Sequence, residues 1–320
     1  MMRLAVLDDW QGIARAAAPW ERLAAHGIGV DVFGPPFASE DEAAAALAPY
    51  DILVPTRERT LFPGTLIARL PRLRMIAQTG RIPPSLDRAA CAARGIVLTT
   101  TEGDLVPAAT GELAFALLLA AARGLAVGDA GMRAGRWQEG VPEGMVLEGR
   151  TLGLVGLGRI GARVAAMGRA FGMRVIAWSQ YLTPERAAEH GAVAVDKATL
   201  FSESDAISLH VVLSERTRGI VDAAAIAAMK PGAILVNTSR GPLVDEAALL
   251  AALHAGRIRA GLDVYGTEPV PPDHPIRSAP NTVLTPHLGF SAAPIFRQFY
   301  GEALAAVEAW LAAGAPPATG

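Results

Sequence analysis

The sequence predicts an α/β protein built from two doubly wound parallel-sheet domains. Its 320 residues are too many for one ordinary hydrophobic core, so two domains are expected. Short apolar runs alternate with helical segments, a pattern typical of parallel sheets covered by helices on both faces. Near the middle of the chain, a strand leads directly into a glycine-rich turn and a helix. Each domain is therefore expected to repeat the strand–helix–strand unit.

The N-terminal third is expected to form the first sheet. Its strand candidates are separated by alanine-rich or amphipathic segments such as Asp41–Leu47 and Gly64–Leu70, which we predict to be helices. The strand candidates are Leu4–Leu7, Val30–Phe33, Asp51–Val54, Leu73–Ala77 and Ile96–Thr99.

A second alternating series predicts the other domain. It follows a long apolar helix over Ala108–Leu125 and a Gly-rich stretch over Gly128–Gly149, which holds surface loops or a short helix. An amphipathic helix near Ser291–Ala312 and a short Ala/Pro/Gly tail end the chain, so no appended regulatory domain is expected. The strand candidates of this series are Thr151–Val155, Arg174–Trp178, Ala192–Val195, Ala206–His210, Ala233–Thr238, Ala260–Val264 and Thr282–Leu284.

Composition narrows the class of protein. Hydrophobic residues make up 51% of the chain, charged residues make up 19%, and the formal net charge is −2. Well-filled cores are therefore expected, and neither nucleic acid nor a membrane surface is an expected partner. The single cysteine, Cys91, excludes an intrachain disulfide and suits a reducing cytoplasm.

Targeting segments and metal sites are not expected either. Asp8 and Asp9 interrupt the first apolar stretch, which we predict to be a strand and not a signal peptide. The apolar run Leu113–Ala122 is too short to span a membrane and is predicted to be a buried core helix. The histidines lack local ligand spacing, so no metal is expected.

The strongest local signal is the pattern Gly156-x-Gly158-x-x-Gly161, between a predicted strand and a predicted helix over Ala162–Phe171. In a Rossmann-type turn the first glycine permits the tight turn, and the second lets the backbone approach a pyrophosphate. The third lets the helix pack closely against the sheet. Free N–H groups at the helix N-terminus then attract the phosphates. The sequence therefore predicts a bound dinucleotide.

Two further residues of this turn, Arg159 and Ile160, are expected beside the cofactor. Arg159 either reaches the pyrophosphate or is a solvated charge at the start of the helix.

Ser179 stands where an acid that binds the ribose is expected, about 20 residues after the turn. A carboxylate would repel the 2′-phosphate of NADP, whereas a serine donates a hydrogen bond to a hydroxyl or a phosphate. The expected cofactor is NAD or NADP, with dual use or NADP favoured. Arg174 and Arg186 lie nearby in the sequence. Alternatively, Ser179 is an ordinary strand-end residue and another group sets the preference.

Taken together, the motifs resemble the D-isomer-specific 2-hydroxyacid dehydrogenases, a family that includes glycerate and hydroxypyruvate reductases, phosphoglycerate dehydrogenases and formate dehydrogenases. The resemblance covers nearly the whole chain. Its markers, in order, are Arg57 in Arg-Glu-Arg-Thr, the Gly80 loop, Glu112, the glycine turn, Val236-Asn-Thr-Ser-Arg-Gly241, Gly261-Leu-Asp-Val-Tyr-Gly-Thr-Glu-Pro269 and Thr285-Pro-His-Leu-Gly289.

The resemblance implies catalysis by Arg240, Glu268 and His287. Reduction of a 2-keto acid needs a hydride on the carbonyl carbon and a proton on its oxygen, and histidines exchange protons near neutral pH. Glu268 would favour the imidazolium and orient the ring, and the guanidinium of Arg240 would anchor the substrate. Each residue also has a structural alternative: a buried histidine, an arginine paired at a helix start, and a loop acid.

The resemblance also implies cofactor contacts at further strand ends. Asp263 matches a family aspartate near the nicotinamide and the adenine-side strand ends, and Thr238 and Ser239 are expected to line the nicotinamide pocket. His210 ends a strand in a cofactor-side loop and is expected to be structural or to make backbone contacts.

The substrate side matches the family less closely. Family members bind the substrate carboxylate through backbone amides of a Gly-rich loop, which corresponds to the loop at Gly80. Here Pro83-Pro84 replaces a polar pair, and Arg81 either adds charge beside the carboxylate or faces solvent. Arg57 and Trp137 are further pocket candidates with structural alternatives.

We therefore predict two Rossmann-like domains with an active site in the cleft between them. The substrate domain would comprise residues 1–99 and 287–320, and the dinucleotide-binding domain residues 100–286. The expected protein is a cytoplasmic NAD(P)-dependent D-2-hydroxyacid dehydrogenase, and the resemblance implies a homodimer that forms through the long helix and the Gly-rich segment.

Two alternatives remain open at this point. One is a dinucleotide-sensing protein of the corepressor type, which would need no turnover. The other is a dehydrogenase for another small anion, such as formate or phosphite, because the loop at Arg81 departs from the family pattern.

Overall fold

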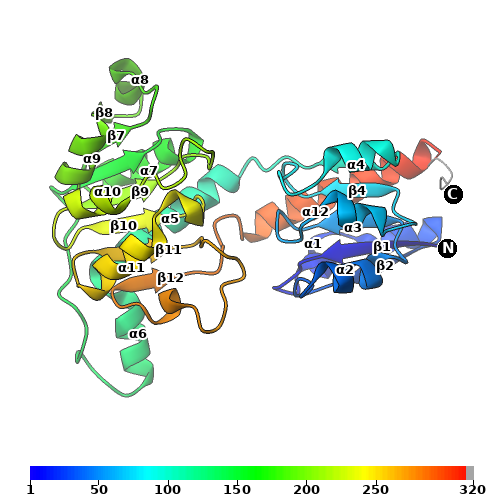
Figure 1. Cartoon of the computed structure of the whole chain (residues 1–320), viewed down its shortest axis with the longest axis horizontal. Coiled ribbons are helices and arrows are strands. Elements are labelled where there is room, and N and C mark those ends of the chain that lie inside the picture. Colours follow the sequence, from blue (N-terminus) through cyan, green and yellow to red (C-terminus); the bar gives the residue numbers. More distant parts are fainter. Residues whose placement is uncertain (315–320) are drawn as a thin grey trace. The chain divides into compact units, whose positions relative to one another are not determined.

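The structure, a computed structural model, describes residues 1–314 and confirms the predicted fold class. It contains one five-stranded and one seven-stranded parallel sheet, each with its own helices (Figure 1). The chain divides into two compact units: unit 1 comprises Met1–Leu105 and the chain from Ala292 onward, and unit 2 comprises Val106–Ser291. Residues 315–320, in the predicted Ala/Pro/Gly tail, lie outside the described residues.

The sheet of unit 1 has the strand order β2-β1-β3-β4-β5, with all pairs parallel. Both faces of β1 are covered, and Leu4, Val6 and Leu7 are fully buried. This burial explains the continuous apolar run in the sequence, because a parallel strand between two helical layers has no polar face. The strands are β1 (Met2–Leu7), β2 (Ile28–Val32), β3 (Ile52–Pro55), β4 (Met75–Gln78) and β5 (Val97–Thr100).

Helices form two rows in unit 1. The helices α1 and α12 contact each other, and α12 also lies on β4 and β5, whereas α2, α3 and α4 form a second row (Figure 1). The elements are α1 (Ala14–Ala17), the 3₁₀ helix η1 (Trp20–His26), α2 (Glu40–Leu47), α3 (Gly64–Ala68), α4 (Arg88–Ala93) and α12 (Ala293–Ala312).

The sheet of unit 2 has the order β12-β11-β10-β9-β6-β7-β8, again with all pairs parallel. The direction of winding changes between β6 and β9, and in doubly wound sheets ligands bind at the carboxyl ends of strands at such a point. The strands are β6 (Thr151–Val155), β7 (Arg174–Trp178), β8 (Val193–Ala194), β9 (Ala206–Leu209), β10 (Ile234–Asn237), β11 (Arg259–Leu262) and β12 (Thr282–Leu284).

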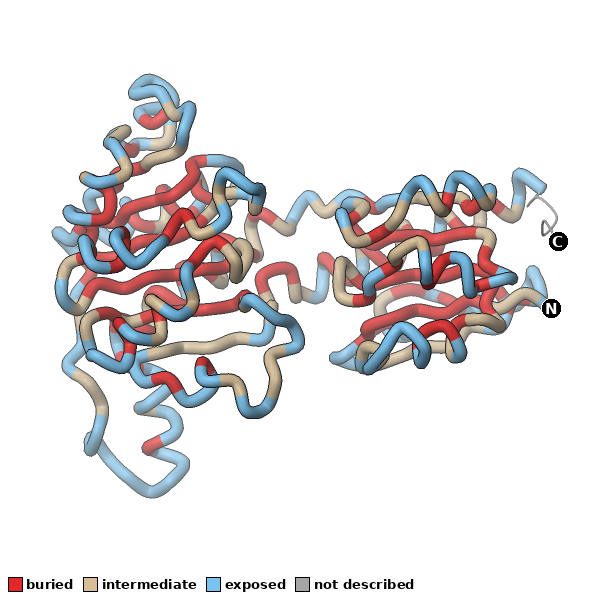
Figure 2. Tube along the Cα trace, in the orientation of Figure 1, coloured by how far each residue is buried: buried red, intermediate tan, exposed pale blue. Residues whose placement is uncertain are grey.

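Helices cover both faces of this sheet too. The helices α5 and α7 pack together, and α5 lies against β10 and β11, whereas α10 contacts α9 and α11 in the other layer. Figure 2 shows that the strands are largely buried while the outer helical surfaces are exposed. The elements are α5 (Val106–Arg123), α6 (Leu125–Arg133), α7 (Arg159–Ala170), α8 (Pro184–Glu189), α9 (Lys197–Glu203), α10 (Ala223–Ala228), η2 (Gly241–Leu243), α11 (Glu246–His254) and η3 (Pro275–Ser278).

The predicted helix Ala108–Leu125 is wrong at its C-terminal end. The helix α5 ends at Arg123 because Gly124 takes a left-handed conformation with φ of 62°, and α6 begins directly after it. By length and composition alone α5 is apolar enough to cross a membrane, but half of it is buried inside unit 2. Its buried side chains, such as Leu117 and Leu118, belong to the core beneath β6 and β10, as predicted for a core helix.

Candidate active site

The predicted site residues of unit 2 lie together at one edge of its sheet. Because all strands are parallel, the segments that follow β6, β9, β10, β11 and β12 share the carboxyl edge. The glycine turn follows β6, and His210 follows β9, on either side of the point where the winding changes. The amide of His210 donates to the carbonyl of Val155, at a distance of 2.7 Å, and joins these two strand ends.

Two glycines of the turn are required by close packing. Gly156 has a φ of 96°, and a Cβ atom there would lie 2.7 Å from the carbonyl oxygen of His210. A side chain at Gly161 would collide with the carbonyl oxygen of Gly156. Both positions therefore exclude other residues, as the sequence pattern predicts.

Gly158 differs, because nothing lies within 4 Å of the place where its Cβ would be. It is the N-cap of the twelve-residue helix α7 and has an extended conformation, with no side-chain cap on the helix. The first turn of α7 therefore has no side-chain acceptor at its N-cap, and the positive end of the helix attracts an anion. Arg159, the first residue of α7, is exposed, and Ile160 is half-buried. This end of the helix fits the pyrophosphate of a dinucleotide.

Polar atoms without partners also mark this edge. Both ring nitrogens of His210 and the hydroxyl of Thr238 are shielded from solvent, and within residues 1–314 they have no hydrogen-bond partner. Burial lowers the pKa of His210 to about 4, so its ring is neutral and can donate one hydrogen bond and accept another. Unpaired buried polar groups are costly, and a bound ligand would satisfy them.

Ser179 directly follows β7 and is half-buried. The preceding residue, Trp178, accepts a hydrogen bond from the amide of Gly156 at 2.8 Å, so Ser179 adjoins the glycine turn. Arg174 lies elsewhere: its guanidinium binds Glu203 and Thr151 at the amino edge of the sheet. Arg186 lies on α8 and is exposed.

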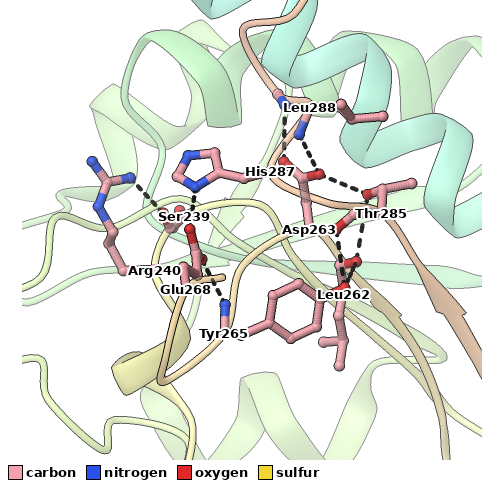
Figure 3. A network of polar contacts seen from close by, with 10 residues as sticks. Ser239, Arg240, Leu262, Asp263, Tyr265, Glu268, Thr285, His287 and Leu288 are labelled. Carbon is pink, nitrogen blue, oxygen red and sulfur yellow. Dashed lines mark hydrogen bonds and ion pairs between the residues drawn. The ribbon is translucent and has the colours of Figure 1, made fainter. Parts of the chain in front are cut away.

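His287 and Glu268 form a close pair. Nδ1 of His287 lies 2.6 Å from Oε2 of Glu268, and the amide of Tyr265 donates to Oε1 of the same carboxylate at 2.8 Å (Figure 3). Because both oxygens are engaged, the carboxylate is fixed in place. It orients the imidazole and leaves Nε2 as the nitrogen that can exchange a proton with a ligand.

Charges around Glu268 keep it ionised. Burial alone would raise the pKa of this carboxyl, but the hydrogen bond and charge of His287 hold it below its usual range, with a smaller contribution from Arg240. Arg240 follows β10, and its Nη1 donates to the carbonyl of Ser239 at 2.6 Å. Figure 3 shows the side chains of Arg240, Glu268 and His287 directed toward the same region.

The backbone at His287 is strained and held by Asp263. His287 has a φ of 56°, a left-handed conformation that is uncommon for residues other than glycine. Its amide donates to the backbone oxygen of Asp263 at 2.9 Å. The carboxylate of Asp263 accepts hydrogen bonds from the amides of Leu288 and Gly289, at 2.6 and 2.9 Å. Asp263 therefore positions the segment that carries His287, a contact that the motif match did not indicate.

Thr285 completes this support, and sequence reasoning assigned it no role. Its hydroxyl donates to Asp263 at 2.7 Å, so the fully buried carboxylate has three donors. Burial nevertheless raises the pKa of Asp263. The hydroxyl of Tyr265 lies 3.1 and 3.0 Å from the carbonyls of Leu262 and Thr285 and ties β11 to β12. The only sequence signal for Thr285 was its place at the start of the marker Thr285-Pro-His-Leu-Gly289.

The predicted substrate residues lie in unit 1. Arg57 follows β3 in a left-handed conformation, with φ of 61°, and its guanidinium lies against Gly80 after β4. Its backbone is fixed, because its amide donates to Thr79 and its carbonyl accepts from Gln78, at 2.8 and 2.7 Å. Gly80 donates its own amide to the hydroxyl of Thr101 at 2.7 Å.

The amide of Gly80 is therefore engaged within unit 1, which leaves the following residues of the loop to meet a ligand. Arg81, the next residue, is exposed.

A buried carboxylate at the end of β1 was not anticipated. Asp8 is 1% exposed, has a φ of 62°, and accepts hydrogen bonds from the hydroxyl and amide of Thr60, at 2.9 and 3.2 Å. Burial raises its pKa to about 6. Asp9 caps the following turn by accepting from the amides of Ile13 and Ala14, both at 2.9 Å.

Comparison with known proteins agrees with this geometry. A family model described as D-isomer specific 2-hydroxyacid dehydrogenase, NAD binding domain, matches residues 115–289. The structure of a phosphoglycerate oxidoreductase from Vibrio cholerae O395 matches with a TM-score of 0.92 and 37% identity, over 98% of this chain and 100% of that one.

Curated relatives carry related names. D-3-phosphoglycerate dehydrogenase of Mycobacterium tuberculosis H37Rv is 39% identical over 282 residues, which are 88% of this chain and 53% of the relative. Glyoxylate reductase of Thermococcus litoralis is 43% identical over 232 residues, 70% of each chain. The chain spans about half the length of the curated phosphoglycerate dehydrogenases that it matches, 47% in one from Mycobacterium leprae. By these matches, the chain belongs to the D-isomer specific 2-hydroxyacid dehydrogenase family and contains its NAD-binding domain.

Proposed function

We propose that this protein is an NAD(P)-dependent dehydrogenase that interconverts a small 2-keto acid and the corresponding D-2-hydroxy acid. The observation that carries the proposal is the 2.6 Å pair of His287 and Glu268, at the same sheet edge as the open N-terminus of α7. The pair supplies a proton donor and acceptor, and the helix end supplies a place for the cofactor phosphates. The names of the relatives, glyoxylate reductase and D-3-phosphoglycerate dehydrogenase, support this substrate class.

In the reductive direction, Nε2 of His287 donates its proton to the carbonyl oxygen of the substrate while Glu268 stabilises the imidazolium through Nδ1. A bound nicotinamide supplies the hydride, or accepts it in the reverse direction. The guanidinium of Arg240 binds the substrate carboxylate and polarises the adjacent carbonyl group. In the oxidative direction, neutral His287 accepts the proton of the substrate hydroxyl.

The substrate-binding residues that we assign to unit 1 are Arg57 and Arg81, on either side of Gly80, whose own amide is engaged by Thr101. The support for this assignment is the anchored backbone of Arg57 and its guanidinium against Gly80, which present a cation at the carboxyl edge of β3 and β4. Asp263 and Thr238 belong to the nicotinamide end of the site, and Ser179 to the ribose end.

We assign a homodimer in the cytoplasm to this enzyme. The helix α6 projects from the rest of unit 2 (Figure 1). It and the following segment expose large apolar side chains, with Leu125, Met132, Trp137 and Val146 between 54% and 71% exposed. A hollow of about 570 Å³ lies between α5, residues 145–148 and the end of α7. Exposed apolar surface of this kind suits contact with a second copy.

The decisive experiment follows oxidation of NADH and NADPH by absorbance with glyoxylate, hydroxypyruvate, pyruvate and bulkier 2-keto acids. We expect turnover with at least one of these acids. In His287→Ala, turnover should fall about 100- to 10,000-fold because the proton donor is lost, whereas the Kd for NADH should stay within about twofold.

His254→Ala is the matched control, because His254 is an exposed histidine at the end of α11 and its removal should leave the rate unchanged. An unchanged rate in His287→Ala would remove His287 from proton transfer. Tight NADH binding without turnover on any acid would indicate a dinucleotide sensor.

A further inference from the structure

At the ribose end of the site, Ser179 occupies the position at which a carboxylate would select NAD. Ser179 stands at the end of β7, next to the glycine turn, and its carbonyl accepts a hydrogen bond from the amide of Leu182 at 3.1 Å. This bond closes a turn that holds Gln180 and Tyr181. A ribose 2′-phosphate placed here would therefore meet a hydroxyl and not a negative charge. Selectivity for that phosphate also needs a cation within reach.

The cations near Ser179 in the sequence do not provide an obvious partner. Arg174 is committed to Glu203 and Thr151 at the opposite edge of the sheet, at 2.5 and 3.3 Å. Arg216, which is distant in the sequence, reaches this turn instead: its Nη1 donates to the hydroxyl of Tyr181 at 3.2 Å. Sequence proximity was therefore a poor guide to the charge at this end of the site.

The contact between Arg216 and Tyr181 joins two strand ends that flank the glycine turn. Tyr181 lies after β7 and Arg216 lies in the loop after β9, and β7 and β9 are the two neighbours of β6 in the sheet. The contact therefore spans the strand that leads into Gly156. A dinucleotide bound at the N-terminus of α7 would extend its adenosine toward these same strand ends.

The loop holds Arg216 on a well-defined turn. The hydroxyl of Thr217 donates to the carbonyl of Val212 at 2.7 Å and accepts from the amide of Ser214 at 2.8 Å. Arg216 precedes Thr217 and is exposed, so most of its N–H donors face solvent. Tyr181, which the guanidinium contacts, is 71% exposed, so part of its ring beside Arg216 is uncovered.

We propose that Arg216, Ser179 and the hydroxyl of Tyr181 form a subsite for the 2′-phosphate of an adenosine ribose, so that the protein prefers NADPH to NADH. The guanidinium offers a planar pair of donors that matches phosphate geometry, and the two hydroxyls add further donors. This inference rests on the proposed dinucleotide site, but it assigns a specificity that the glycine turn itself does not carry.

The test measures binding and not turnover. Isothermal titration calorimetry compares 2′,5′-ADP with 5′-AMP, which differ only in the 2′-phosphate, on the whole chain and its variants. We expect the native chain to bind 2′,5′-ADP at least about tenfold more tightly than 5′-AMP. Arg216→Gln should weaken the binding of 2′,5′-ADP by about tenfold and change the affinity for 5′-AMP by less than about twofold. Ser179→Asp should reverse the preference through charge repulsion.

Two matched variants remove the same charge from nearby positions. Arg218→Gln lies two residues further along the same loop, and Arg186→Gln lies on α8 after Ser179. Both should leave the ratio of the two affinities unchanged. If Arg218→Gln loses as much affinity for 2′,5′-ADP as Arg216→Gln, the loss is a general effect of the charge of the loop. If Arg186→Gln loses more, the phosphate binds elsewhere. Either result overturns the proposal.

Failure of this proposal is distinguishable from failure of the dinucleotide site. If the native chain binds NADH and binds both probes equally well, the 2′-phosphate subsite is wrong and the dinucleotide site stands. If it binds neither NADH nor either probe, the dinucleotide site is wrong and the subsite falls with it.

Discussion

The two units have similar sheets but opposite chemistry at the strand ends where the winding changes. In unit 2, β6 leads into Gly156 and Gly158, and the N-terminus of α7 is left without a side-chain cap. In unit 1, β1 leads into Asp8 and Asp9, and the carboxylate of Asp9 already occupies the amides of Ile13 and Ala14. The same β–α–β crossover is thus open to an anion in one unit and closed in the other.

The acids of the two edges differ in the same way. Burial raises the pKa of Asp8 to about 6, whereas the partnership with His287 holds the pKa of Glu268 below its usual range. Asp8 has the hydroxyl and amide of Thr60 as hydrogen-bond partners, and burial outweighs the charge of the neighbouring Arg59. At Glu268 the hydrogen bond and charge of His287 outweigh burial. The fold therefore does not confer the function; the residues that follow the central strands do.

The largest effect should come from giving the N-terminus of α7 in unit 2 a carboxylate, as Asp9 provides after β1 in unit 1. Gly158→Asp places a carboxylate at the N-cap of α7, where no atom lies within 4 Å of the new Cβ, so the fold should survive. Repulsion between this carboxylate and a pyrophosphate should raise the Kd for NADH by more than about 300-fold, measured by fluorescence titration.

Gly158→Ala is the control for this variant, because it adds the Cβ without the charge. It should raise the Kd for NADH by no more than about tenfold. Equal losses in the two variants would mean that space and not charge controls this end of the helix.

The second effect concerns Asp8, at the end of β1 in unit 1. Because the pKa of Asp8 is raised in the folded state, the folded chain binds more protons than the unfolded chain between about pH 4 and pH 6. Its free energy of unfolding therefore falls as the pH rises through this window. In Asp8→Asn the position does not titrate, so the free energy of unfolding of the variant should rise relative to that of the native chain by about 2 kcal/mol between pH 4 and pH 7.

Urea unfolding at several pH values measures this difference. Asp104→Asn, at an exposed position of unit 1, should differ from the native chain by the same amount at every pH. A pH-independent difference for Asp8→Asn would show that folding does not raise the pKa of Asp8.

The smallest effect should come from neutralising Glu268 in unit 2. Glu268→Gln keeps the shape of the side chain but removes the charge that favours protonated His287. The alkaline limb of the reduction profile should move to lower pH, and the rate at neutral pH should fall by no more than about tenfold. The measurement is kcat against pH with a 2-keto acid substrate.

Glu246→Gln offers a matched control, since Glu246 pairs with His274 at 3.2 Å and not with His287. Its profile should coincide with that of the native chain. If the profile of Glu268→Gln also coincides, the carboxylate orients the ring without influencing its protonation.

Local signals in the sequence were sufficient for the fold and for much of the site. Parallel strands buried on both faces appear as short apolar runs, so segments such as Thr151–Val155 and Arg174–Trp178 could be placed with the bounds that the structure has. Gly156 and Gly161 were predictable because only glycine fits where a Cβ would meet a carbonyl oxygen. The pairing of His287 with Glu268 was expected from the resemblance and from the chemistry of the two residue types.

Contacts between distant segments were not predictable in the same way. The support of the His287 segment by Asp263 joins residues after two neighbouring strands, and no pattern along the chain reveals which donors a carboxylate meets. Arg216 reaches Tyr181 because β7 and β9 lie on either side of β6, an order that exists only in the folded sheet. The end of α5 was unpredictable for another reason. It depends on the left-handed backbone conformation of Gly124, which the apolar pattern of the side chains does not show.

Unit 2 is one uninterrupted segment of the chain, from Val106 to Ser291, and it carries the glycine turn, Arg240, Glu268 and His287 together. In genetic terms, recombination at only two points in the gene would exchange the whole of unit 1 while leaving in their native context the residues that we propose for hydride and proton transfer. A continuous segment of this kind could be combined with different substrate domains, so the substrate specificity could change in evolution or by design while the residues of unit 2 stay the same.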